Sequence, residues 1–112
     1  MNAERAVFVY TTCPSLVEAE RIGKALLERR LAACVNILPG MVSVYSWQGA
    51  MESSPESLLL IKTERQAYPR LEARLRELHP YVLPEIIALD IERGLPDYLK
   101  WISQCLTPAS HP

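Results

Sequence analysis

The residues best suited to chemistry lie between positions 79 and 85, where His79-Pro80-Tyr81 is followed by Pro84-Glu85. Imidazole and carboxylate groups both bind transition-metal ions. A helix is predicted to end at His79 and a strand to begin after Glu85, so two prolines hold polar groups on a rigid connection between buried elements. We interpret His79 either as a metal ligand or as a side chain that caps the helix or hydrogen-bonds across a subunit interface.

The three cysteines, Cys13, Cys34 and Cys105, are odd in number and have no C-x-x-C spacing, which argues against a disulfide framework and a structural zinc site. Reduced thiols are therefore expected. Cys13 comes just before a predicted helix, whose dipole would favour the thiolate and make it a candidate metal ligand. Cys34 is either a small buried apolar side chain or a soft ligand or reactive thiol at a subunit seam.

Patterns of apolar residues predict the helices. Ser15 and Glu18 have the spacing of a capping box, and apolar residues recur at helical spacing from there to position 30. Leu71, Leu75 and Leu78 form the apolar stripe of a second helix over 69–78. Pro96 opens a short last helix, and the tail over 107–112 is expected to be frayed.

The predicted strands cover residues 6–12, 31–38, 42–47, 57–63 and 86–92. A turn is predicted at Pro39-Gly40, and residues 49–55 are polar and rich in turn formers. Alternation over 42–47 places Tyr45 and Trp47 on one face of a long antiparallel ribbon.

Counting the ribbon as one hairpin, the order of elements is that of a double split βαβ unit, an α+β ferredoxin-like two-layer sandwich in a single domain over 1–112. Such a sandwich leaves one face of the sheet uncovered. Because the strands are apolar on both faces and the ribbon is too long for so small a body, we expect homo-oligomerisation through the sheet.

Charge and composition narrow the classes of function. Twelve Lys and Arg against thirteen Asp and Glu give a net charge of -1 without a basic cluster, so nucleic acid is not an expected partner. No window is long and apolar enough for a membrane span, and the acidic start lacks the pattern of a signal peptide, so a cytoplasmic protein is expected. No nucleophile–base or phosphate-binding motif is present, so we do not expect an enzyme.

Motifs along nearly the whole chain resemble the CutA, or divalent-cation tolerance, family. The matching segments are Thr11-Thr12-Cys13-Pro14, Leu31-Ala32-Ala33-Cys34-Val35-Asn36, Ser43-x-Tyr45-x-Trp47-x-Gly49, Glu56 with Ile61-Lys62-Thr63, His79-Pro80-Tyr81-x-x-Pro84-Glu85-Ile86 and Tyr98-Leu99-x-Trp101-Ile102. The resemblance implies a tight homotrimer with extended hairpins joining three sheets, built like the PII signalling proteins. It also implies a role in the response to divalent metal ions, with copper foremost.

The copper ligands described for the family fall here at Thr11, Leu78 and His79, so only one histidine is kept. A site would have to borrow Cys13, Glu85 or a group from another subunit.

Lys62 ends an apolar strand and must either reach solvent or pair with a carboxylate, for which Glu56 and Glu85 are the candidates. The functional alternative is a cleft between subunits that receives a metal ion or a small anion in the manner of PII-like effector sites, formed by Cys34, Trp47, Glu56, Lys62, Tyr81 and Glu85 with His79 nearby. Trp47 and Trp101 could instead pack in the interface. Two functions remain: a trimeric copper-binding tolerance protein, and a PII-like sensor or protein-interaction scaffold.

Overall fold

The computed structural model describes residues 5–107 as a four-stranded antiparallel sheet with three helices. The strands lie in the order β2-β3-β1-β4, which is the order of a ferredoxin-like sandwich and confirms the predicted fold class. The elements are β1 (Ala6–Cys13), α1 (Leu16–Glu28), β2 (Cys34–Trp47), β3 (Ala50–Glu64), α2 (Tyr68–Leu78), β4 (Ile86–Asp90) and α3 (Pro96–Leu106). The expected frayed tail over 107–112 lies, apart from Thr107, outside the described residues.

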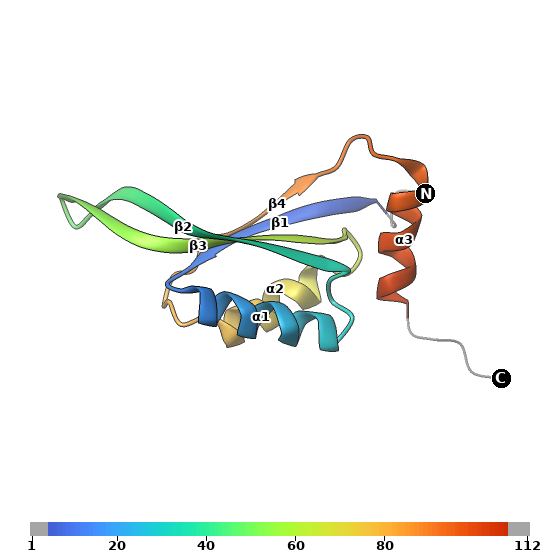
Figure 1. Cartoon of the computed structure of the whole chain (residues 1–112), viewed down its shortest axis with the longest axis horizontal. Coiled ribbons are helices and arrows are strands. Elements are labelled where there is room, and N and C mark those ends of the chain that lie inside the picture. The colour runs from blue at the N-terminus through green and yellow to red at the C-terminus, as the bar shows by residue number, and fades with distance from the viewer. Residues whose placement is uncertain (1–4, 108–112) are drawn as a thin grey trace.

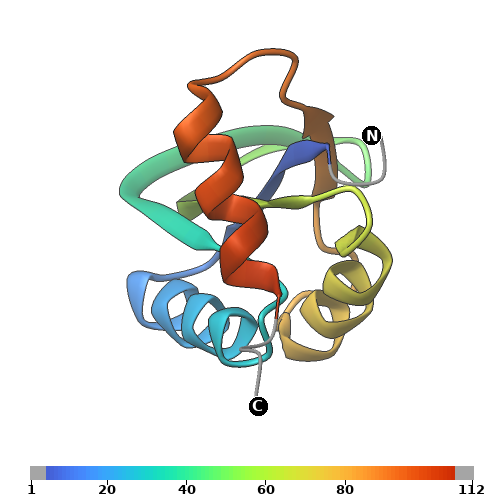
Figure 2. The same ribbon diagram turned by 90° about the vertical axis from the view of Figure 1, so that its right-hand side faces the viewer.

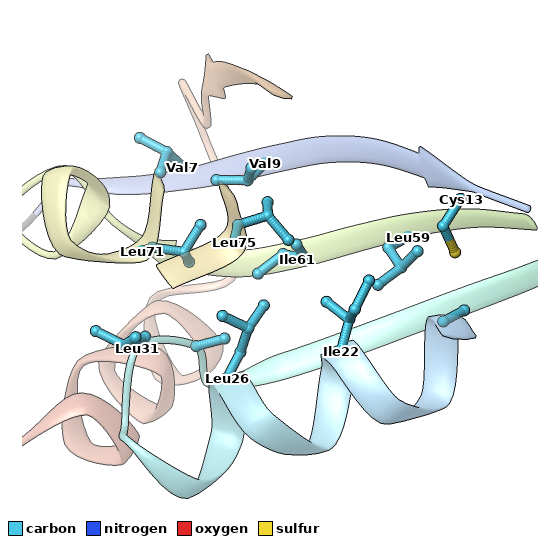
Figure 3. Close-up of a cluster of buried hydrophobic side chains, with 12 residues drawn as sticks. Val7, Val9, Cys13, Ile22, Leu26, Leu31, Leu59, Ile61, Leu71 and Leu75 are labelled. Carbon is cyan, nitrogen blue, oxygen red and sulfur yellow. The ribbon is translucent and has the colours of Figure 1, made fainter. Parts of the chain in front are cut away.

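The core lies between the sheet and helices α1 and α2, which cover one face (Figure 1). Val9 and Ile61 from the sheet meet Leu26 and Leu75 from the helices, and all four are fully buried (Figure 3). The capping box opens α1 as predicted, because the Oγ of Ser15 accepts the backbone N–H of Glu18 at 3.2 Å. None of the helices within residues 5–107 is both long and apolar enough to cross a membrane.

The opposite face of the sheet is covered only at one end. Helix α3 stands across that end (Figure 2), where Ile102 is buried with Ala6 and Ala33. Further along the face, Leu38, Ile87 and Leu89 are 48%, 48% and 56% exposed. The uncovered apolar face expected from the sequence is therefore present in the single chain.

Two predicted turns are placed wrongly. The chain does not reverse at Pro39-Gly40; β2 continues through this point with a bulge, and Gly40 adopts a φ of 78°. The reversal occurs at Gln48 and Gly49, with φ values of 51° and 83° between the paired residues Trp47 and Ala50. Positive φ at both central residues is the requirement of a type I′ hairpin turn. Residues 50–55, predicted as turn-rich, therefore belong to strand β3.

The bulge changes which residues of β2 face a given side of the sheet: even-numbered residues before the bulge and odd-numbered residues after it lie on the same face. Leu38 pairs with Leu58, but Met41 pairs with Glu56, so β2 carries one extra residue there. Beyond the bulge the odd-numbered residues of β2 share a face with the even-numbered residues of β3. We call the part of the hairpin over residues 41–56 the arm; it projects beyond the helices (Figure 1) and gives the molecule extents of 56 × 28 × 23 Å.

Candidate functional site: a carboxylate and aromatic hollow

A hollow of about 830 Å³ lies between one face of the arm and the connection from α2 to β4. The residues that line it are Thr12, Tyr45, Trp47, Glu52, Ser54, Glu56, Pro80, Tyr81, Val82, Leu83 and Glu85. Of the predicted cleft, Trp47, Glu56, Tyr81 and Glu85 are thus brought together. Every charged side chain in the lining formed by the described residues is a glutamate.

Glu56 is held in place by two hydroxyl donors. Ser43 donates to its Oε1 at 2.5 Å, and the phenol of Tyr81 donates to its Oε2 at 2.7 Å. Burial raises the pKa of Tyr81 well above its usual range, and the hydrogen bond to Glu56 raises it further, because both favour the neutral phenol. Since each carboxylate oxygen has two lone pairs, Glu56 keeps acceptor capacity toward the hollow.

His79 positions Tyr81. Its buried ring contacts the carbonyl oxygen of Thr12 through Nε2 at 2.7 Å, and its Nδ1 accepts the backbone N–H of Tyr81 at 3.2 Å. A carbonyl can only accept, so these partners assign the neutral tautomer with the proton on Nε2. The rings of His79 and Tyr81 also pack, with centroids 4.9 Å apart. Both ring nitrogens of His79, one of the two predicted metal ligands, thus have partners within the chain.

The predicted helix cap is made by the backbone of His79, whose N–H bonds to the carbonyl oxygen of Leu75 at 2.9 Å. The side chain is left to join the end of α2 to β1 through Thr12. His79 therefore links the helix layer to the sheet directly beside the hollow.

Cys13, the other predicted metal ligand, is fully buried at the end of β1. Its thiol contacts the carbonyl oxygen of Ser15 at 3.6 Å. Burial raises the pKa of the thiol, and the bond to Ser15 offsets only part of that rise. The expectation that the dipole of α1 favours the thiolate is wrong, because loss of solvation is the larger effect at this position.

Lys62 and Cys34 do not line the hollow. They are paired neighbours on β3 and β2, with Lys62 Nζ 3.7 Å from the sulfur of Cys34 and in contact with the side-chain oxygen of Asn36. No ion pair joins Lys62 to Glu56 or Glu85 within residues 5–107 of the single chain, and the pair expected at the trimer seam stays a prediction. Lys62 and Glu56 are six positions apart on one strand, about 20 Å, which is too far for contact.

The remaining predicted residue, Trp101, stacks on Tyr98 of α3 with centroids 5.5 Å apart. Within the described part of the chain, no cluster of three or more His, Cys, Asp or Glu side chains could hold a metal ion.

The sequence did not predict Thr12, Tyr45, Glu52 and Ser54 as parts of the site. Alternation had already placed Tyr45 beside Trp47 on one face of the ribbon, and this could have identified it. Glu52 and Ser54 were hidden because their segment was assigned to a turn. In the structure, Tyr45 and Ser54 are diagonal neighbours on paired strands of the arm, with their hydroxyls 2.7 Å apart.

The sequence model of the CutA1 divalent ion tolerance protein family matches residues 7–105. The chain belongs to this family. It is 51% identical over 96 residues to the divalent-cation tolerance protein CutA of Thermus thermophilus, which covers 86% of this chain and 93% of the relative. It is 42% identical over 102 residues to protein CutA of the mouse, but spans only 58% of that protein.

Solved CutA structures have the same fold. CutA of Xylella fastidiosa has a TM-score of 0.90 at 47% identity, covering 92% of this chain and 99% of its own. The structure described as the periplasmic divalent cation tolerance protein CutA from Archaeoglobus fulgidus has a TM-score of 0.88 at 42% identity, covering 91% and 99%. The family, and with it the link to divalent-cation tolerance, is therefore shown by sequence and by fold.

Proposed function

We propose that this CutA1-family protein is a cytoplasmic homotrimer that binds divalent cations, copper foremost, and contributes to metal tolerance without catalysing a reaction. The observation that carries the proposal is the hollow beside the arm, whose charged lining consists of Glu52, Glu56 and Glu85. Carboxylates that converge on one space attract cations and supply oxygen ligands. Among the divalent first-row metals we expect Cu(II) to bind most tightly, because sites of nitrogen and oxygen donors prefer it.

The uncovered face of the sheet supports a homotrimer. Leu38, Ile87 and Leu89 expose apolar surface there, and Val42 and Val44 expose 65% and 68% of their surface on the arm. A closed oligomer would bury such surface and would bring carboxylates of several subunits near one another. Residues 5–107 of one chain group no three metal-ligating side chains, so assembly and metal binding are coupled in this proposal.

The test is isothermal titration with Cu(II), and with Cu(I) under reducing conditions, on protein whose mass has been determined by light scattering. Saturable binding to a trimer that is weakened in Glu56→Gln and Glu85→Gln is the expected result. Glu20→Gln, which removes the same charge from an exposed position on α1, is the matched control. Unchanged copper binding in both Glu56→Gln and Glu85→Gln, or a protein that is monomeric in solution, would refute the proposal.

The second candidate is a sensor or scaffold that binds a small ligand, and the size of the hollow favours it. Ligand sites for small molecules commonly span about 300–1,000 Å³, and the hollow measures about 830 Å³. Since Lys62 lies outside this space, loss of ligand binding is expected on substitution of Trp47 and not of Lys62. Ligand binding lost in Lys62→Ala and kept in Trp47→Leu would contradict this placement.

A further inference from the structure

We propose that the hollow beside the arm takes an organic ammonium ion, a positively charged nitrogen that carries alkyl groups, held by the rings of Tyr45, Trp47 and Tyr81 and by the lining glutamates. The inference rests on the small-ligand role proposed above and assigns to an organic cation the same glutamates that the metal proposal assigns to a metal ion. Three properties of the lining carry it: the sign of its charge, its aromatic rings and its volume.

The charge of the lining selects a cation. Glu52, Glu56 and Glu85 contribute negative charge, and the described residues place no Lys, Arg or His in the wall. An anionic effector would meet three carboxylates without a compensating donor of positive charge, which is unfavourable in a partly enclosed space. The expectation of a small anion in this cleft therefore does not suit its lining.

The aromatic rings suit an alkylated cation better than a bare one. The hydroxyl of Tyr45 is hydrogen-bonded to Ser54 and that of Tyr81 to Glu56. A ligand in the hollow would therefore contact these two residues through their rings. Trp47 is 51% exposed and adds an indole, the strongest partner in cation–π contacts. A quaternary or alkylated ammonium ion can contact the ring faces and the carboxylates at the same time, and it needs few hydrogen bonds.

The volume also favours an organic ion. A metal ion with six bound waters occupies roughly 200 Å³ at about 30 Å³ per water, against a hollow of about 830 Å³. The exposed apolar residues Val82 and Leu83 line the same space and would contact alkyl groups. A ligand with a cationic head and an apolar body fills the hollow more completely than a hydrated metal.

The experiment uses the two tryptophans of the chain as separate reporters. In Trp101→Phe the only indole is Trp47, in the hollow; in Trp47→Leu the only indole is Trp101, on α3. Choline chloride is titrated as the quaternary ammonium probe into the full-length protein in a metal-chelating buffer. The controls are 3,3-dimethylbutan-1-ol, its neutral isostere, and inorganic phosphate.

We expect choline to change the fluorescence of Trp101→Phe saturably and to leave that of Trp47→Leu unchanged. By calorimetry, Trp47→Leu should weaken choline binding about fivefold, which is the size of an exposed cation–π contact. The neutral isostere should bind at least about tenfold more weakly than choline. Glu52→Gln should also weaken choline binding, and because Glu52 is exposed on the arm this variant avoids disturbing the bonds of Glu56.

The proposal is overturned if choline shows no saturable binding, if the isostere binds equally well, or if phosphate binds in its place. Choline binding that is unaffected by both Trp47→Leu and Glu52→Gln would place the ligand elsewhere and would also overturn it. Copper titrations on the same variants keep the two proposals distinguishable. A protein that binds copper and no choline refutes only the ammonium site, and one that binds choline and no copper refutes only the metal role.

Discussion

Replacing His79 with alanine is expected to destabilise the metal-free protein by about 3 kcal/mol. The substitution removes the contact of Nε2 with Thr12 and the bond from the Tyr81 N–H to Nδ1, each contributing about 1 kcal/mol. It also removes the packing of the His79 and Tyr81 rings, and such aromatic pairs contribute roughly 0.5–1.5 kcal/mol. The sum is a large part of the stability of a small domain.

The assay is equilibrium unfolding in urea, followed by circular dichroism, with a chelator present and at one fixed protein concentration. A lower midpoint with an unchanged slope reports the loss of stability. His79→Gln keeps an amide that can donate to the Thr12 carbonyl oxygen and should recover part of the loss. Gln104→Ala, at an exposed position on α3, is the control for a surface change.

A loss below about 0.5 kcal/mol in His79→Ala would refute this reasoning, since that is the effect of an ordinary surface substitution. The ring nitrogens would then be available to a metal. If the same variant also lost stoichiometric copper binding, His79 would be a ligand and not a positioning residue.

Three further predictions concern single groups. Iodoacetamide should label Cys34 at least about tenfold faster than Cys13 in the native protein, because Cys13 is buried and its pKa is raised; equal rates by mass spectrometry would contradict this. Absorbance at 295 nm should show a phenol that titrates above the usual range of tyrosine and is missing in Tyr81→Phe, whereas Tyr68, whose pKa is also raised by burial, still titrates late in that variant. Because the folded-state pKa of Tyr81 is raised, the stability that its phenol contributes is present below about pH 10 and is lost as the pH rises through that pKa. If the free energy of unfolding of Tyr81→Phe fell with alkaline pH in the same way as that of the parent protein, this prediction would be contradicted. Ser15→Ala should cost about 1 kcal/mol through loss of the cap on α1, and an unchanged unfolding midpoint would show that the cap contributes nothing.

The spacing of apolar residues along the sequence predicted the helices and strands that other elements of the same chain bury. The buried runs at β1 and β3 and the stripes of α1 and α2 were found because neighbouring elements of the same chain bury them. The arm was the difficult region, because its residues are not covered by their own chain and no apolar alternation marks residues 50–55. Gly40 was ambiguous as well, since a positive φ is needed both in turns and in bulges.

The candidate site was predicted in part for the same reason. Glu56, Tyr81 and Glu85 were grouped correctly because the motifs flank predicted element ends, which meet at one edge of the sheet. Lys62 does not reach Glu56 within the chain, because the two residues lie six positions apart in one continuous strand; its place in a cleft between subunits stays a prediction. The bonds of His79 to Thr12 and Tyr81 depend on tertiary packing of α2 against β1, which a linear pattern does not contain.

The bulge at Pro39-Gly40 makes the composition of the hollow insensitive to the loss of one residue at that point. Leu38 and Met41 face the same side of the sheet, because they pair with Leu58 and Glu56, so three steps along β2 match two steps along β3. Deleting one of the two bulge residues would leave two steps on each strand, so that regular alternation would keep Tyr45 and Trp47 on the face of Glu52 and Glu56. In comparisons within the family, a single gap at this position therefore removes the bulge and leaves the residues of the hollow in place.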